Sequence, residues 1–149
     1  MKQEKGITMI ALILLVVIVG VVVFVGIQYF QKYAKNQEKE DIKATMLSIQ
    51  GIITNVKNKN KVDEENNLLE GTKIEIENNQ TQYKINDELK NILSGMEGAE
   101  LYVLNQEELQ AHGIKNVEIT ENKFYIIDYN SSEVYYSLGI EGKYKLSEM

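Results

Sequence analysis

The chain has no cysteine, no proline and no tryptophan, and all 16 of its strongly basic residues are lysines. Without cysteine, neither a disulfide framework nor a thiolate metal site can form. The single histidine, His112, leaves too few imidazoles for a histidine-based metal site, and its position before Gly113 suits a helix end. The sequence also has no glycine-rich phosphate loop and no calcium-loop spacing. These absences predict no catalytic residue, no metal and no cofactor, and therefore a protein that is not an enzyme.

One predicted turn places polar groups close together. Asp128 and Glu133 flank Asn130-Ser131-Ser132 and can face each other across a hairpin. Paired carboxylates across a turn indicate acid–base catalysis only weakly. The sequence near the two serines shows no residue that could serve as a general base for them. We interpret these residues as turn formers.

The formal net charge is −6, but it is unevenly distributed. Residues 32–61 carry seven lysines against three acids, a net +4, whereas residues 62–149 carry seven lysines against 18 acids, a net −11. A basic segment beside a membrane attracts anionic lipid headgroups. An acidic domain repels nucleic acid, so we expect no nucleic-acid partner and assign Lys57, Lys59 and Lys61 to a helix C-terminus rather than to a DNA-binding patch.

A long apolar run begins near the N-terminus. Ile7 to Ile27 contains no charge, and the first charge after it is Lys32. An apolar run of about 20 residues crosses the ~30 Å hydrocarbon core of a bilayer as one helix. A removable signal peptide has a shorter apolar core and a small-residue cleavage site, which is missing after Gly26. We therefore predict a retained transmembrane helix over residues 7–30.

The helical pattern continues beyond the apolar run, to about Val56. Apolar residues recur at steps of four and three and form one stripe, which consists of Ile42, Met46, Ile49, Ile53 and Val56. Such a stripe must bury against another part of the protein. We predict an amphipathic helix over residues 31–58 that packs on a small domain formed by residues 59–149.

The pattern of residues 59–149 predicts a small domain that contains both helices and strands. The expected elements are a strand over 73–77 with a hairpin partner over 81–85, a helix from Asn86 to Gly95, a strand over 101–104, a helix from Asn105 to Gly113, a hairpin of 123–129 with 133–138, and an edge strand over 143–146. Five tyrosines near the C-terminus suit either covering a sheet or contacting a partner. The fold class is α+β.

The residues around Gly6 resemble a known processing signal. Lys5-Gly6-Ile7-Thr8-Met9-Ile10-Ala11 is similar to the N-terminal motif of type IV prepilins and type II secretion pseudopilins. In that family a prepilin peptidase cuts after the glycine and methylates the new N-terminal amine. The resemblance implies a leader over residues 1–6, cleavage between Gly6 and Ile7, N-methylation of Ile7, and Lys5, Gly6 and Thr8 as matching motif positions.

Two positions depart from the family pattern. Ile7 stands where phenylalanine or methionine is commoner, and Ala11 stands where the family usually has glutamate. A glutamate is costly in lipid and is normally kept for a partner, here the N-terminal amine of a neighbouring subunit. Ala11 cannot make that contact. The resemblance therefore implies a minor subunit, similar to many pilin-like proteins of low-GC Gram-positive bacteria.

The resemblance implies a pilin-like lollipop fold and a structural subunit of a type IV pilus, type II secretion or competence apparatus. Its partners would be prepilin peptidase, other pilin or pseudopilin subunits, the assembly platform and the membrane. The alternative is a single-pass anchor that carries an extracellular binding or sensor domain. Lysines after the span weakly favour a cytoplasmic domain, but large domains often cross regardless of flanking charge. The motif implies a single-pass protein of the cell membrane with a cytoplasmic N-terminus and an extracellular domain.

Overall fold

The computed structural model describes residues 2–62, 69–77 and 82–149, with side chains from Thr8 onward. Its first element is a single helix, α1 (Lys2–Val62), of 61 residues. The chain divides into two compact units, residues 1–40 and residues 41–149. The second unit begins inside the predicted amphipathic segment, because the C-terminal part of α1 belongs to its core.

The helix ends later than the sequence pattern predicts. The predicted end near residues 56–58 is wrong, since α1 continues to Val62. Residues 52–62 contain neither glycine nor proline, so nothing breaks the backbone there. Lys59 and Lys61 lie in the last turn, where they complement the partial negative charge of the helix C-terminus.

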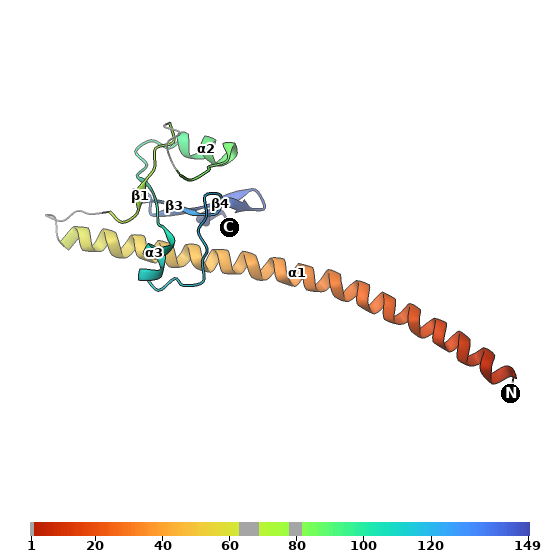
Figure 1. The fold of residues 1–149 in the computed structure, drawn as a ribbon. Helices are drawn as coiled ribbons and strands as arrows, with labels where there is room; N and C mark the ends of the chain where they lie inside the picture. Colours follow the sequence, from red (N-terminus) through yellow and green to blue (C-terminus); the bar gives the residue numbers. More distant parts are fainter. Residues whose placement is uncertain (1, 63–68, 78–81) are drawn as a thin grey trace. The chain divides into compact units, whose positions relative to one another are not determined.

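The second unit contains a five-stranded antiparallel sheet whose strands follow sequence order. The strands are β1 (Thr72–Lys73), β2 (Leu101–Val103), β3 (Tyr125–Asp128), β4 (Glu133–Ile140) and β5 (Lys143–Lys145). Three short helices accompany them: α2 (Asp87–Ser94), α3 (Gln106–Ala111) and the 3-10 helix η2 (Leu146–Glu148). These elements confirm an α+β fold with a long N-terminal helix and a small antiparallel sheet (Figure 1).

Both faces of the sheet are covered, and strand alternation decides which side chains face which helix. Tyr125, Ile127 and Tyr129 pack with the C-terminal part of α1, whereas Phe124 and Ile126 pack on the α2 side. In Figure 1, α1 and α2 lie on opposite sides of the sheet. The layers are therefore α1, sheet and α2, as expected when successive strand residues point to opposite faces.

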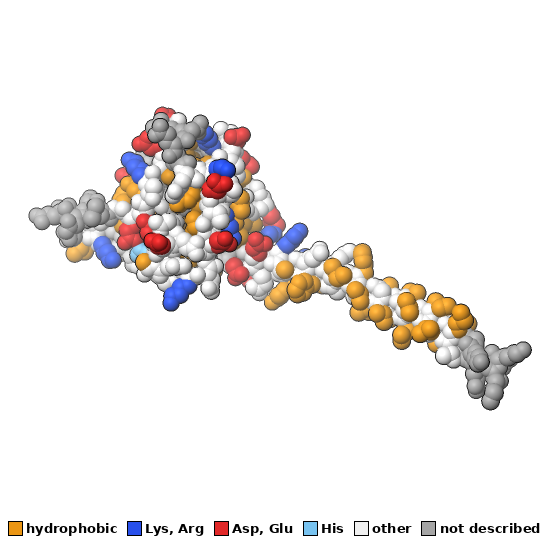
Figure 2. Space-filling view, viewed as in Figure 1, with side chains coloured by type: hydrophobic (Ala, Val, Ile, Leu, Met, Phe, Trp, Pro, Cys, Tyr) orange, Lys and Arg blue, Asp and Glu red, His pale blue; other side chains and the backbone are white. Residues whose placement is uncertain are grey.

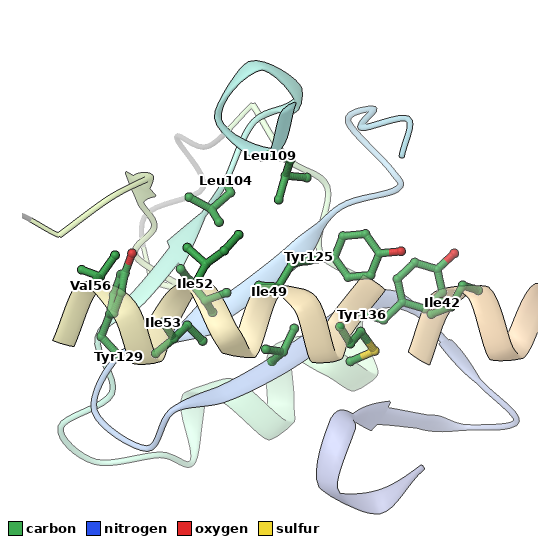
Figure 3. Packing of buried hydrophobic residues seen from close by; sticks show 13 residues of the cluster. Ile42, Ile49, Ile52, Ile53, Val56, Leu104, Leu109, Tyr125, Tyr129 and Tyr136 are labelled. Carbon is green, nitrogen blue, oxygen red and sulfur yellow. The ribbon is translucent and has the colours of Figure 1, made fainter. Parts of the chain in front are cut away.

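The predicted apolar stripe of α1 is buried. Its five members are at most 9% exposed, and Ile52 joins them at 5%. Figure 3 shows the stripe facing Tyr125, Tyr129 and Tyr136 of the hairpin. The expectation that this stripe packs on the sheet is confirmed.

Local sequence signals locate both short α-helices correctly. The Asn86 side chain accepts a hydrogen bond from Leu89 N at 2.8 Å and caps α2. Asn105 and Glu108 form a reciprocal capping box at the start of α3, with both hydrogen bonds at 2.8 Å. Each cap satisfies backbone donors that the first turn of a helix leaves free.

The predicted strand over 73–77 is mostly wrong. Only Thr72 and Lys73 pair with β2, and the last backbone hydrogen bond runs from Ile74 N to Leu101 O. The partner strand β2 begins at Leu101, so the ladder between β1 and β2 stops at this hydrogen bond. The expected hairpin partner is also wrong over 82–85, where Lys84 N instead donates to Glu121 O. The predicted turn at Asn78-Asn79 and Thr81 lie outside the described residues.

Candidate functional site

From Met9 to Phe30, α1 presents apolar side chains to its surroundings. Every residue from Thr8 to Glu38 is exposed, and apolar residues such as Ile10 (69%) and Phe24 (65%) are among the most exposed. Figure 2 shows apolar side chains gathered along this segment. A patch of this extent in water is a liability that soluble monomers avoid.

The same segment meets the requirements of a membrane span. Among the described residues, α1 is the one helix long and apolar enough to cross a membrane by length and composition. All of its backbone groups outside the ends are hydrogen-bonded within the helix, as the hydrocarbon core demands. A single-pass anchor is the arrangement that these properties indicate.

The predicted processing residues lie at the start of this helix. The backbone of Lys5, Gly6 and Ile7 is helical, and their side chains lie outside the described residues. Thr8, the last motif residue, is exposed. Ala11 lies three residues further on and is exposed as well, and no acid follows it before Glu38. The span therefore offers no carboxylate to a partner.

The carboxylate pair of the hairpin is engaged with backbone and turn groups. Asp128 and Glu133 are cross-strand neighbours, as expected, and are 1% and 9% exposed. Asp128 Oδ1 accepts from Glu100 N and Asn130 N at 3.0 Å each, and its Oδ2 accepts from Ser131 Oγ at 2.7 Å. Glu133 Oε1 accepts from Ser147 N at 3.1 Å. Both carboxylates hold backbone segments together, which agrees with their interpretation as turn formers.

His112 lies where the sequence predicts it, at the end of α3. It is the C-cap residue, and its Nε2 contacts Glu70 Oε2. The backbone oxygen of Glu70 accepts a hydrogen bond from the Tyr129 hydroxyl at 2.6 Å. Within the described ranges no three His, Cys, Asp or Glu side chains gather where they could hold a metal ion. The contact between His112 and Glu70 links the segment before β1 to α3.

The clustered tyrosines cover the sheet. Tyr125 and Tyr136 stack with ring centroids 5.2 Å apart, and both are at most 3% exposed. Burial, with a smaller contribution from Tyr136, raises the pKa of Tyr125 to about 12, and burial also raises the pKa of Tyr135 to about 12. Burial and the charge of Glu70 raise the pKa of Tyr129. These phenols stay protonated at neutral pH and act as packing and hydrogen-bonding groups.

A contact between α1 and the hairpin turn was not visible in the sequence. Gln50 Nε2 donates to Ser132 O at 3.1 Å, and Lys57 Nζ donates to Ser132 Oγ at 2.8 Å. Ser132 has a φ of 59°, a left-handed conformation that is uncommon for a residue other than glycine. Lys57 therefore holds the turn, while Lys59 and Lys61 lie in the last turn of the helix as predicted.

The surface of the second unit also has a groove of about 600 Å³. It is lined mainly by polar side chains, including Gln82, Asn105, Glu107 and Glu121, together with Tyr83 and Ile119. No family profile, curated protein or solved structure matches the chain. The functional interpretation therefore depends on the residues and geometry described above.

Proposed function

We propose that this chain is a minor, pilin-like structural subunit of a type IV pilus, type II secretion or competence apparatus. The single observation that carries the proposal is Lys5-Gly6-Ile7-Thr8 placed directly before an uncharged, fully exposed helical segment. The helix that contains this segment ends at Val62, and its C-terminal part lies in the hydrophobic core of the second unit. Prepilin peptidase, other subunits, the assembly platform and the membrane are its partners.

Processing is the first test. A prepilin peptidase should cut between Gly6 and Ile7 and leave a methylated Ile7 at the N-terminus. Intact mass of the protein purified from its native membrane should show the loss of residues 1–6 with one added methyl group. Gly6→Val should block the cut because the glycine is the sensitive position in the family, whereas Gln3→Val, three residues earlier, should be processed normally. A wild-type protein that retains Met1 contradicts the proposal.

The membrane topology is the second test. Residues 41–149 should lie outside the cell, with the N-terminus in the cytoplasm. Protease treatment of intact cells should release fragments from beyond residue 60, and a cytoplasmic protein of the same cells should stay intact as a control. Protection in intact cells, with cleavage only after lysis, would place the domain in the cytoplasm and exclude the pilin-like function.

Position 11 is alanine where the family usually has glutamate, and this difference leads to the third test. A major subunit forms many identical contacts, and without that carboxylate each contact lacks an ionic partner. A tip subunit needs only the contacts below it. Quantitative mass spectrometry should therefore find the protein scarce in sheared filaments and abundant in membranes of the same cells. If it is the most abundant filament protein, the assignment as a minor subunit is wrong.

The alternative function is a single-pass anchor with an extracellular binding or sensor domain. Ala11 favours this alternative, because the span lacks the carboxylate that would bind the N-terminal amine of a filament neighbour. The groove beside Tyr83 and Asn105 offers polar groups to a ligand. A processed protein that occurs in membranes and never in filaments, even when the assembly machinery is present, would favour this function over the first.

A further inference from the structure

Three aromatic residues gather at the C-terminal end of the apolar segment. Tyr29, Phe30 and Tyr33 are 73%, 73% and 64% exposed, although large aromatic side chains are usually buried. From Thr8 to Gln28 the helix contains one other aromatic residue, Phe24. The exposed aromatics are thus concentrated within five residues rather than spread along the helix.

Their position along α1 matches the thickness of a bilayer. Thr8 and Tyr29 are 21 residues apart, which corresponds to about 32 Å of helix at ~1.5 Å per residue. The hydrocarbon core is about 30 Å thick. When the apolar segment fills that core, Tyr29 and Tyr33 come to the boundary between acyl chains and headgroups.

The charge of the helix changes at these aromatic residues. From Thr8 to Gln28 the segment has no charge, whereas Lys32 lies between Phe30 and Tyr33, and Lys35 follows two residues after Tyr33. Gln37 Nε2 donates to the Tyr33 hydroxyl at 3.2 Å, so the phenol oxygen lies toward the polar segment. An apolar ring with a wet hydroxyl suits the membrane interface, and lysine side chains can extend from there to lipid phosphates.

We propose that Tyr29, Phe30 and Tyr33 form an aromatic belt that binds the headgroup region of the phospholipid bilayer and sets the depth of α1. The inference rests on the proposed membrane anchor and adds which residues define its outer boundary. The occupant is lipid, because the belt lies at the end of a segment whose length fits the bilayer and whose flanking lysines complement anionic headgroups.

The lack of tryptophan in the chain allows a clean measurement of depth. Single-tryptophan variants Tyr33→Trp and Ile18→Trp of the full chain are placed in vesicles of phosphatidylcholine and phosphatidylglycerol. The vesicles carry nitroxide quenchers either near the headgroup or near the acyl-chain end. Ile18 is 53% exposed and lies midway along the segment, which makes it the matched control.

Tyr33→Trp should be quenched at least about twofold more by the shallow nitroxide than by the deep one, with the opposite order for Ile18→Trp. Adding Tyr29→Ala and Tyr33→Ala to Ile18→Trp should lower its preference for the deep quencher. Adding Phe24→Ala should not, because Phe24 is exposed but lies inside the apolar segment.

Equal quenching of Tyr33→Trp by both nitroxides overturns the belt. So does no quenching of Tyr33→Trp while Ile18→Trp is quenched from the deep position, a result that places Tyr33 out of reach of the lipid. No quenching of either variant overturns the belt and the membrane anchor together. A double alanine variant that behaves like Phe24→Ala shows that the aromatics do not set the depth.

Discussion

Ile49→Asp should unfold the second unit of the protein. Ile49 is 0% exposed and lies in the centre of the interface between α1 and the hairpin (Figure 3). The substitution removes roughly 1.5–3 kcal/mol of apolar burial and places a carboxylate in a fully buried apolar cluster. A small domain has about 5–15 kcal/mol of stability in total, so the combined loss exceeds or nearly equals it.

The test uses a soluble fragment that begins at residue 32, so that the membrane segment does not interfere. Circular dichroism should show a cooperative thermal transition for the wild type and none for Ile49→Asp. Leu47→Asp is the matched control, because Leu47 lies two residues away on the same helix and is 58% exposed. Its melting temperature should stay near that of the wild type. If Ile49→Asp melts like Leu47→Asp, the stripe does not carry the stability of the domain.

Asp128→Ala should have the second largest effect on stability. The carboxylate is 1% exposed and accepts three hydrogen bonds, two from backbone amides and one from Ser131. Its removal leaves these donors without their acceptor beside the hairpin turn. Hydrogen bonds to a charged group contribute more than neutral ones, and we expect a loss of about 2–4 kcal/mol.

Urea unfolding of the same fragment measures this loss as a lower midpoint with an unchanged slope. Glu121→Ala is the control, because the Glu121 side chain is 55% exposed and pairs with Lys84 at the surface at 2.9 Å. An exposed ion pair contributes about 0–1 kcal/mol. Asp128→Asn keeps one acceptor oxygen, and its urea midpoint should fall between those of Asp128→Ala and Glu121→Ala. Equal midpoints for Asp128→Ala and Glu121→Ala would mean that the turn does not depend on this carboxylate.

Local patterns in the sequence predicted much of the fold correctly. The caps at Asn86 and Asn105 and the hairpin of β3 and β4 follow from residues within a few positions of each other. Strand alternation from Phe124 to Tyr129 places successive side chains on the two faces of β3. Helix caps and tight hairpins depend on local backbone chemistry, which explains why these predictions were confirmed.

The errors arise where an element depends on a distant partner. Ile74 to Glu77 alternate as a strand should, yet β2 begins at Leu101, whose backbone oxygen accepts from Ile74 N, and the antiparallel ladder goes no further. The helix also ends later than predicted, at Val62, because residues 52–62 contain no glycine or proline that would stop it. Strand length is a property of a pair of segments, and one segment alone does not reveal it.

The sequence by itself determined the apolar span, the resemblance of Lys5-Gly6-Ile7-Thr8 to a processing motif, Ala11 and the amphipathic stripe, because each is a property of neighbouring residues along one chain. The tertiary structure decided that the stripe meets Tyr125 and Tyr136, that Asp128 accepts from Glu100, and that Gln50 and Lys57 hold Ser132. The hydrogen bond from Gln50 to Ser132 alone joins residues that are 82 positions apart. Only the folded backbone brings such groups within hydrogen-bonding distance, since the order of residues carries no direct record of that approach.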